Sequence, residues 1–367
     1  MSEKKTLTVE LGSRSYPITI GSDLLAHTLE YLQQSGINPS QVFVVTDDVV
    51  EPLYTDALCN QLAQRWETEL AVIPAGEESK CLDMAQQIWE RMLEGGCDRK
   101  TLVLAVGGGV VGDLAGFAAS TYMRGVAFYQ IPTTLLAQVD SSVGGKTAID
   151  LEYGKNVVGT FYQPQGVLID TDTLKSLDSR QYLAGLGEVV KYGIILDEKF
   201  FHYMEGHVNE ILARDSETLQ EIIFRCCQLK ARIVQEDEKE LSGRRALLNY
   251  GHTFAHAIET FERFSGKLHG EAVSAGMTAA AQFARYLGYI TPEVALRHNQ
   301  LIANLGLDQS WSPNLSPEKT VQIMQRDKKS AGGHINFVLP EAIGSCSLVS
   351  DISEEQLLDF LKSLMKQ

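Results

Sequence analysis

The chain has 367 residues, of which 44% are hydrophobic and 22% are charged. This composition is that of an ordinary folded protein and excludes both a disordered chain and a collagen-like fibre. The length exceeds that of one typical domain, so we expect two. The 32 basic and 47 acidic residues give a formal net charge of −15, which disfavours a nucleic-acid or anionic-membrane partner. Any anionic ligand must therefore be bound by a local basic cluster.

The six cysteines, at positions 59, 81, 97, 226, 227 and 346, form no C-x-x-C pair. This spacing argues against a disulfide framework and against a zinc ribbon. The N-terminal residues lack the apolar core of a signal peptide, and no uncharged apolar run approaches the ~20 residues of a membrane span. We therefore expect a protein of the reducing cytoplasm.

The first half of the chain alternates short apolar runs with segments of helical periodicity. The runs of strand length are 42–46, 70–73, 102–106, 127–131 and 167–170. Helical patterns over about 53–66 and 81–93 separate the first three runs. This alternation is typical of βαβ units with a parallel sheet. We expect residues 1–177 to form an α/β, Rossmann-like domain.

The second half is dominated by amphipathic patterns of helical period. They cover 188–196, 217–235, 246–261, 271–286 and 316–326, the last with Ser316 as N-cap and Pro317 in the first turn. Residues 334–339 and 346–349 could pair as a hairpin before a final helix over 354–365. We expect residues 178–367 to form a mainly α-helical C-terminal domain. A ligand site in the cleft between the two domains is then the favoured geometry.

A glycine-rich turn, Gly107–Asp113, follows a predicted strand and opens a predicted helix. It fits the pattern G-x-G-x-x-G, in which glycines let a phosphate approach the backbone at a helix N-terminus. Alternatively, the segment has only a structural role as a tight strand-to-helix turn. We favour phosphate binding because four glycines fall within six positions. The acid that normally follows about 20 residues later is missing. Asp47 and Asp48 could contact a ribose instead, although capping of the next helix is at least as plausible.

The segment from Asp140 to Thr147 superficially resembles a P-loop, but Asp140 replaces its leading glycine. A carboxylate at that position would repel a triphosphate. Lys146 and Lys155 more plausibly reach a substrate anion, because both lie in glycine-rich stretches that we expect to be loops at the carboxyl edge of the sheet. A single lysine is more often a solvated surface residue.

Three of the eight histidines, His252, His256 and His269, fall within 18 residues. His252 and His256 are spaced i, i+4 and so share a helix face, and Glu188 is an acid within an apolar helical pattern. One carboxylate and two imidazoles with an open position form a catalytic zinc set. The spacing leaves open which two histidines bind the metal, and each alone could be a surface or core histidine.

Basic residues lie close to these motifs in the sequence. In an acidic protein they indicate a small substrate with several negative charges. Lys230 and Arg232 could equally form the solvated face of a helix. The set is Arg124, Lys191, Lys230, Arg244, Arg245, Lys328 and Lys329.

Taken together, these motifs resemble those of the 3-dehydroquinate synthases, a family of sugar phosphate cyclases of the shikimate pathway. The resemblance runs over nearly the whole chain. Its most specific segments are 107–113, 132–146, 155–156, 187–191, 249–259 and 268–271.

The resemblance implies two cofactors, NAD+ and one divalent metal ion, zinc or cobalt. Glu188, His252 and His269 would bind the metal, which leaves His256 facing the substrate. The residues that would contact NAD+, with Asp47 added from the pattern above, are Asp47, Glu77, Lys80, Gly109, Val110, Val111, Gly112, Asp113, Thr133, Thr134, Lys146, Lys155, Thr173, Leu174, Lys175 and Ser176.

The resemblance also assigns groups to a sugar phosphate substrate. Its carboxylate would be bound by Lys230 and Arg245, and its ring hydroxyls and carbonyl by Asp140 and Lys191. The family forms homodimers, and Arg124 would reach in from the partner subunit. The groups for the phosphate would be Lys146, Asn156, Asn249, His256 and Lys328.

The implied activity is a phosphate-eliminating carbon–oxygen lyase on the way to chorismate and the aromatic amino acids. It converts 3-deoxy-D-arabino-heptulosonate 7-phosphate to 3-dehydroquinate by transient NAD-dependent oxidation, phosphate elimination, reduction and intramolecular aldol closure. Alternatives are a related cyclase that makes an inosose or valiolone skeleton and a metal-dependent polyol dehydrogenase. A noncatalytic nucleotide-binding regulator would keep the glycine-rich turn but would have no use for the metal set.

Overall fold

The computed structural model describes residues 4–152, 154–262, 266–330 and 335–365, with side chains up to residue 326 in the third stretch. The chain divides into two compact units, which we call unit 1 (Met1–Leu177 and Ser216–Lys239) and unit 2 (Asp178–Asp215 and Glu240–Gln367). This division differs from the expected 1–177 and 178–367 in one segment. Helix α8 (Ser216–Glu236) belongs to unit 1, because it packs on the first two strands of that unit.

Unit 1 is built on a seven-stranded sheet with the strand order β1-β2-β9-β6-β5-β3-β4. The edge pair β1/β2 is antiparallel, and every other neighbouring pair is parallel. The strands are β1 (Lys5–Val9), β2 (Tyr16–Gly21), β3 (Gln41–Asp47), β4 (Glu67–Ile73), β5 (Leu102–Gly107), β6 (Ala127–Pro132) and β9 (Val167–Asp170).

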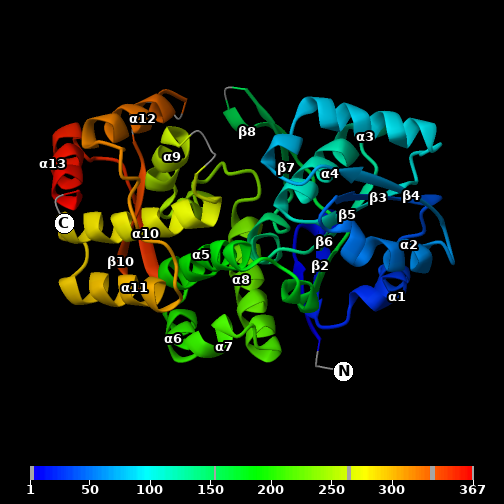
Figure 1. The fold of residues 1–367 in the computed structure, drawn as a ribbon, viewed down its shortest axis with the longest axis horizontal. Helices are drawn as coiled ribbons and strands as arrows, with labels where there is room; N and C mark the ends of the chain where they lie inside the picture. The colour runs from blue at the N-terminus through cyan, green and yellow to red at the C-terminus, as the bar shows by residue number, and fades with distance from the viewer. Residues whose placement is uncertain (1–3, 153, 263–265, 331–334, 366–367) are drawn as a thin grey trace. The chain divides into compact units, whose positions relative to one another are not determined.

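Helices cover both faces of this sheet (Figure 1). Phe43 and Val45 of β3 pack on one face with α3 (Leu82–Glu94) and α4 (Gly109–Thr121). Val42 and Val44 face the other side, against α1 (Thr28–Gln34) and α2 (Asp56–Leu62). Because successive strand residues point to opposite faces, a sheet buried on both sides gives the continuous apolar runs seen in the sequence.

A separate antiparallel hairpin follows the sixth strand of the sheet. It pairs β7 (Lys146–Leu151) with β8 (Gly154–Phe161). Lys146 and Lys155 therefore lie on strands of this hairpin, and the expectation that both lie in loops was wrong. The sequence gives only a weak indication of this hairpin, because most residues of β8 are exposed and show no apolar pattern.

Unit 2 is mainly helical, with one small antiparallel sheet formed by β10 (Phe337–Ala342) and β11 (Ser345–Val349). The aromatic side chains of Phe254, Phe283 and Phe337 pack against one another in its core. The helices are α5 (Ser179–Leu196), α6 (Glu198–Gly206), α7 (Val208–Leu212), α9 (His252–Phe261), α10 (His269–Tyr286), α11 (Pro292–Asn304), α12 (Pro317–Ser330) and α13 (Glu354–Leu364). The α/β fold class with a helical second part is confirmed.

Two predicted elements of unit 2 differ from the structure in detail. The helix expected over 246–261 is broken into a 3₁₀ turn, η8 (Arg245–Asn249), and α9, because Gly251 adopts a left-handed φ of 79° between them. The predicted hairpin is present, although its first expected residue, His334, lies outside the described residues. Among the described helices, none combines the length and the apolar character needed to cross a membrane.

Candidate functional site

Glu188, His252 and His269 lie together in unit 2, each offering a ligand atom within 4.8 Å of the others. The Nε2 atoms of His252 and His269 are 3.6 and 3.7 Å from Oε1 of Glu188. The three residues come from α5, α9 and α10, respectively. The arrangement is that of three ligands converging on one point.

Glycines next to the three residues let their helices approach this closely. A Cβ atom on Gly270 would lie 1.8 Å from the carbonyl oxygen of Ala184, so the start of α10 rests directly on the backbone of α5. At the start of α9, the carbonyl oxygen of Gly251 would be 2.2 Å from a Cβ atom on Gly276 of α10. A larger side chain at these positions would push apart the helices that carry the candidate ligands.

The two imidazoles are each held through Nδ1, which turns Nε2 toward Glu188. His252 Nδ1 donates to the carbonyl oxygen of Tyr250 at 3.0 Å, and His269 Nδ1 bonds to Oε1 of Glu259 at 3.0 Å. Burial and the Lys191 ammonium lower the pKa of His252 well below its ordinary value. Burial acts the same way on His269, but the Glu259 hydrogen bond and the carboxylate charges outweigh it and raise the pKa of His269.

The chemistry of this donor set fits a divalent cation. Both carboxylate oxygens of Glu188 are buried, and apart from the contact of Oε2 with the Lys191 ammonium they have no hydrogen-bond partner among the described residues. Lys191 forms an ion pair with Glu188. With neutral imidazoles, the carboxylates of Glu188 and Glu259 and the ammonium of Lys191 sum to −1, which a divalent cation would offset. One carboxylate and two imidazoles are the ligand set of open, catalytic zinc sites.

The other predicted residues of unit 2 are not part of this ligand cluster. His256 is exposed, with its ring 5.8 Å from that of His252 and no part in the ligand cluster. Asn249 is exposed on η8, whereas Arg245 is buried and pairs with Glu240 at 3.4 Å. Lys328 lies in α12, and its side chain is outside the described residues.

In unit 1, the glycine-rich turn has the predicted context, since β5 ends at Gly107 and α4 begins at Gly109. Asp47 is the last residue of the parallel strand β3, and Glu77, Thr133 and Thr173 follow the carboxyl ends of β4, β6 and β9. Ligands of open α/β sheets bind at this edge. The structure thus brings these predicted cofactor residues to one edge of the sheet of unit 1, while Lys146 and Lys155 lie on the separate β7/β8 hairpin.

A network of charges lies beside the glycine-rich turn. Lys80 is buried and its Nζ is 2.6 Å from the carboxylate of Asp113 and 3.9 Å from that of Glu77, which also lies 3.4 Å from Lys155. Burial raises the pKa of Asp113, and Lys80 partly offsets this. Although burial opposes them, the charges of Asp113 and Glu77 raise the pKa of Lys80. The pairing keeps a buried lysine charged at the edge of the sheet.

The residues of this edge also fit a dinucleotide. The hydroxyl oxygen of Thr133 is buried and has no hydrogen-bond partner among the described residues. A Cβ atom at Gly109 would lie 3.2 Å from the hydroxyl of Ser141, a tight contact that a glycine avoids. A phosphate at the start of α4 would meet unpaired backbone N–H groups and the favourable end of the helix dipole.

Some predicted cofactor residues have structural roles. Oδ1 of Asp47 accepts hydrogen bonds from the backbone N–H groups of Val49 and Val50, so this carboxylate holds the turn that precedes the next helix, whose N-cap is Val50. The side chains of Val111 and Leu174 are buried in the core, so only their backbone could meet a ligand. Lys175 pairs with Asp172 at 2.8 Å. Tyr54 bonds to the carbonyl of Thr173 and to the hydroxyl of Ser176.

The remaining predicted residues of unit 1 lie at α8, on β8 and in the turn that contains Arg124. Lys230 is buried on α8, and its Nζ donates to the carboxylate and to the carbonyl of Asp140, both at 2.8 Å. Arg232 of the same helix is exposed. Asn156 of β8 accepts a hydrogen bond from Lys80, so it lies beside the charged network. Arg124 is exposed in a turn where its φ is 70°.

Glu259 is a further functional candidate, and no sequence motif assigned it a role. It is buried on α9 and bonds to His269. The available signal was its position seven residues after His252, which places both on one face of the helix. Tyr250 contributes through its backbone, which no side-chain pattern reveals.

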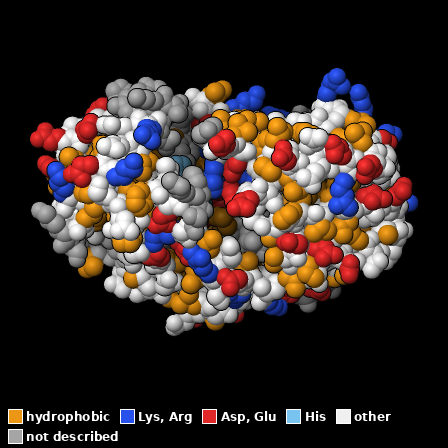
Figure 2. Space-filling view, turned by 45° about the horizontal axis from the view of Figure 1, so that its top comes forward, with side chains coloured by type: hydrophobic (Ala, Val, Ile, Leu, Met, Phe, Trp, Pro, Cys, Tyr) orange, Lys and Arg blue, Asp and Glu red, His pale blue; other side chains and the backbone are white. Residues whose placement is uncertain are grey.

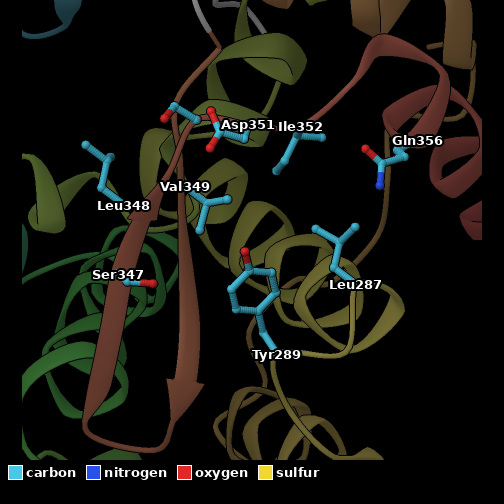
Figure 3. A pocket seen from close by; sticks show the side chains of 9 residues that line it. Leu287, Tyr289, Ser347, Leu348, Val349, Asp351, Ile352 and Gln356 are labelled. Carbon is cyan, nitrogen blue, oxygen red and sulfur yellow. The ribbon is translucent and has the colours of Figure 1, made fainter.

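The surface shows no single basic patch on the face in view, where acidic side chains are spread among hydrophobic ones (Figure 2). A pocket in unit 2 lies beside the β10/β11 hairpin, lined by Leu287, Tyr289, residues 347–352 and Gln356 (Figure 3). The lining includes none of the predicted site residues. The candidate chemistry therefore lies elsewhere, at the ligand cluster and at the sheet edge.

Known proteins resemble the chain over almost its full length. It is 45% identical over 357 residues to a 3-dehydroquinate synthase of Desulforamulus reducens, covering 97% of this chain and 99% of that protein. In structure it resembles ValA, a 2-epi-5-epi-valiolone synthase of Streptomyces hygroscopicus with NAD+ and Zn2+ bound, at 29% identity and a TM-score of 0.87 over 97% of this chain and 98% of that one.

A second solved structure is a 2-deoxy-scyllo-inosose synthase complexed with carbaglucose-6-phosphate, NAD+ and Co2+. It shares 27% identity and a TM-score of 0.88 over 98% of this chain and 99% of that one. Models of the 3-dehydroquinate synthase N-terminal and C-terminal domains match residues 70–184 and 185–330. The chain therefore belongs to the 3-dehydroquinate synthase family.

Proposed function

We propose that the chain is a 3-dehydroquinate synthase, a lyase that converts 3-deoxy-D-arabino-heptulosonate 7-phosphate to 3-dehydroquinate and phosphate. The observation that carries this proposal is the convergence of Glu188, His252 and His269 within 4.8 Å, in a chain of this family. We propose these three residues as the ligands of one zinc or cobalt ion. Glu77, Lys80 and the turn up to Asp113 are proposed to hold NAD+, with the other residues of the sheet edge.

When bound, NAD+ supplies reversible hydride chemistry at a ring carbon, and the metal ion supplies Lewis-acid polarisation of the oxygen on that carbon. The chain's own residues bind and orient the sugar. Lys191, buried beside Glu188, can donate a hydrogen bond to a ring oxygen close to the ligand cluster. His256 is exposed one helical turn after His252, where it can meet the substrate phosphate. We propose that the departing phosphate, and not a protein base, removes the ring proton.

The anionic groups of the substrate need cations and hydrogen-bond donors. Lys146 and Asn156 in unit 1, and Asn249, His256 and Lys328 in unit 2, are proposed for the phosphate. Lys230 and Arg245 are proposed for the carboxylate. Both are buried cations already paired with an acid, Asp140 and Glu240 respectively. A substrate carboxylate could join either pair, whereas a cyclase acting on a substrate without a carboxylate has less need of two such groups.

The proposal is tested by incubating metal-loaded, NAD+-bound enzyme with the heptulosonate phosphate. We expect phosphate release in step with 3-dehydroquinate, and no net increase in NADH absorbance, because the cofactor is regenerated in every turnover. A stoichiometric rise of NADH would instead indicate a polyol dehydrogenase. Turnover of a sugar phosphate that lacks a carboxylate, with none of the heptulosonate, would indicate one of the related cyclases.

A homodimer is part of the proposal. The exposed side chains of Leu151, Val157, Val158 and Phe161, which we call the hairpin patch, lie on the β7/β8 hairpin. An exposed apolar edge strand is suited to covering by another chain. Arg124 is exposed and has a strained φ of 70°, and strain of this kind is found at functional positions. The partner-facing role of Arg124 and the cytoplasmic location remain predictions.

A further inference from the structure

We infer that Glu259 is a positioning residue that orients His269 as a metal ligand and strengthens its bond to the metal. The inference rests on the proposed metal site but not on the identity of the substrate. It concerns a carboxylate that is not itself one of the three converging ligands.

Glu259 is a buried acid with a specific contact. Its side chain is 8% exposed, and Oε1 lies 3.0 Å from Nδ1 of His269. Ala255 and Ile258, on the same helix, are buried apolar residues. A carboxylate in such surroundings is costly unless it is paired. Because no other described side chain bonds to Glu259, the imidazole of His269 is the partner that compensates its burial.

The two nitrogens of His269 face two different carboxylates. Nδ1 bonds to Glu259, and Nε2 lies 3.7 Å from Glu188 in the ligand cluster. A carboxylate can only accept, so the proton of a neutral ring is held on Nδ1 and the lone pair of Nε2 is turned toward the cluster. Glu259 thereby sets both the tautomer and the rotation of the ring. A carboxylate partner also raises the basicity of a metal-bound imidazole.

His252 provides an internal contrast. Its Nδ1 bonds to a backbone carbonyl, that of Tyr250, at 3.0 Å. That partner is neutral and cannot be removed by changing a side chain. The cluster therefore contains one imidazole, His269, that is hydrogen-bonded to a charged carboxylate, and one, His252, that is hydrogen-bonded to a neutral carbonyl. Substitution at position 259 should disturb one metal bond out of three and leave the others in place.

The position of Glu259 follows from helix geometry. Residues seven apart lie on one helix face, and α9 places His252 in its first turn and Glu259 two turns later. His269 begins α10, which packs against α9. The same helix therefore supplies one ligand and the partner of another. This coupling explains a buried acid in a helix whose other inward positions are apolar.

The test measures zinc affinity of the apoprotein by competition with a chromophoric chelator, for the wild type, Glu259→Gln and Glu259→Ala. We expect Glu259→Ala to weaken zinc binding by roughly 10- to 100-fold. Glu259→Gln keeps an acceptor for Nδ1 but loses the charge, so its loss should be smaller. The visible absorption of the Co2+-loaded form should also change in both variants, because the ligand field at His269 changes.

A matched control is Glu271→Gln. Glu271 lies two residues after His269 and pairs with Arg180 at 2.7 Å, while also bonding to the backbone N–H of Leu268. Its loss should lower thermal stability without changing zinc affinity, because it does not contact the His269 ring. If Glu271→Gln weakens zinc binding as much as Glu259→Gln does, the effect is a general loosening of α10, and the inference is overturned.

Unchanged zinc affinity in Glu259→Gln and Glu259→Ala would also overturn the inference. Should Glu259→Ala fail to fold, Glu259→Gln alone decides, since it preserves the shape of the side chain. The outcome is separate from that of the proposed function. A protein that binds zinc as described but does not release phosphate from the heptulosonate would retain the role of Glu259 and lose the proposed reaction.

Discussion

Gly270 of α10 lies so close to Ala184 of α5 that a Cβ atom on the glycine would be 1.8 Å from the alanine carbonyl oxygen. The contact is next to His269 on one helix and one turn before Glu188 on the other. Backbone packing without side chains thus sets the separation of two candidate ligands. Substitution of this glycine tests whether the ligand cluster depends on the helix contact.

We expect Gly270→Ala to destabilise the protein by at least roughly 1–3 kcal/mol, because the extra carbon must push the helices apart. Zinc affinity should fall by roughly 10-fold or more, as for other losses of ligand orientation. Thermal unfolding and chelator competition measure the two effects. Gly206→Ala is the control, since a Cβ atom there meets nothing within 4 Å. Wild-type zinc affinity in Gly270→Ala would contradict this account of the cluster.

Lys80→Met should weaken NAD+ binding and lower thermal stability. The substitution leaves Asp113, 2.6 Å from the lost ammonium, as a carboxylate without its partner beside the glycine-rich turn. Removal of one member of a buried pair is strongly destabilising. Titration of NAD+ by fluorescence quenching, together with thermal unfolding, measures both effects. The exposed Lys100→Met is the control, and equal NAD+ affinity in the two variants would remove Lys80 from the cofactor site.

Lys230→Met should raise the KM for the heptulosonate phosphate and slow phosphate release. Lys230 is a buried cation of α8, whereas Arg232, two residues later, is exposed. Charge-assisted hydrogen bonds to a carboxylate are roughly twice as strong as neutral ones, so the lost contact should be visible in steady-state kinetics. Arg232→Met is the matched control and should behave as the wild type. Equal kinetics in both variants would show that Lys230 serves only its pair with Asp140.

Val157→Lys should shift the protein from dimer to monomer. Val157 is 71% exposed in the hairpin patch, and a lysine there would place a charge in the proposed interface. Sedimentation equilibrium measures the change. Val49→Lys, at another exposed valine of unit 1 outside the patch, should leave the assembly unchanged. A dimer of unaltered stability in Val157→Lys would place the interface on another surface.

The pair between Glu205 and Arg297 should make stability depend on pH. Arg297 donates from Nε and Nη2 to the two carboxylate oxygens at 2.8 and 2.6 Å, and this holds the pKa of Glu205 below its ordinary value of 4.5. A lowered pKa gives stabilisation that is present above the ordinary pKa and is lost as the pH falls through the folded pKa. For this partly buried surface pair we expect about 0.5–1 kcal/mol.

The comparison is urea unfolding of the wild type and Arg297→Met at neutral pH and at a pH well below 4.5. The variant should be less stable at neutral pH, and the difference should vanish in acid. A difference that persists when Glu205 is protonated would show that Arg297 acts through packing on Phe201, whose ring its guanidinium covers at 5.2 Å.

The sequence predicted the strands that carry an uninterrupted apolar run. The apolar runs that became β3 and β5 could be identified because both faces of these strands pack under helices. Strands β1, β2, β7 and β8 were missed. Exposed residues interrupt the pattern of β1 and β8, whereas β2 is almost fully buried but Pro17 and Thr19 break its apolar run. Helix α8 was recognised as a helix but assigned to the wrong unit, because amphipathic periodicity shows that a face is buried without showing what it packs against.

The candidate metal ligands also show that sequence periodicity does not reveal which side chains meet in the fold. Spacing identified Glu188 and three histidines as candidates but left open which two histidines converge on the acid. His252 and His256 share a helix face, so periodicity favours them as a pair, yet His269 from another helix joins His252 instead. That choice depends on the close contact of α9 and α10 at Gly276, a tertiary relation without a local pattern.

The most direct test of the account is the zinc content of purified wild type and His269→Ala, determined by elemental analysis of protein whose fold is checked by circular dichroism. We expect one zinc ion per wild-type chain. The variant should keep its helical spectrum but retain no stoichiometric zinc, because an open site with two remaining ligands binds the ion too weakly. Equal zinc content in the two proteins would contradict the proposed ligand set and, with it, the proposed chemistry.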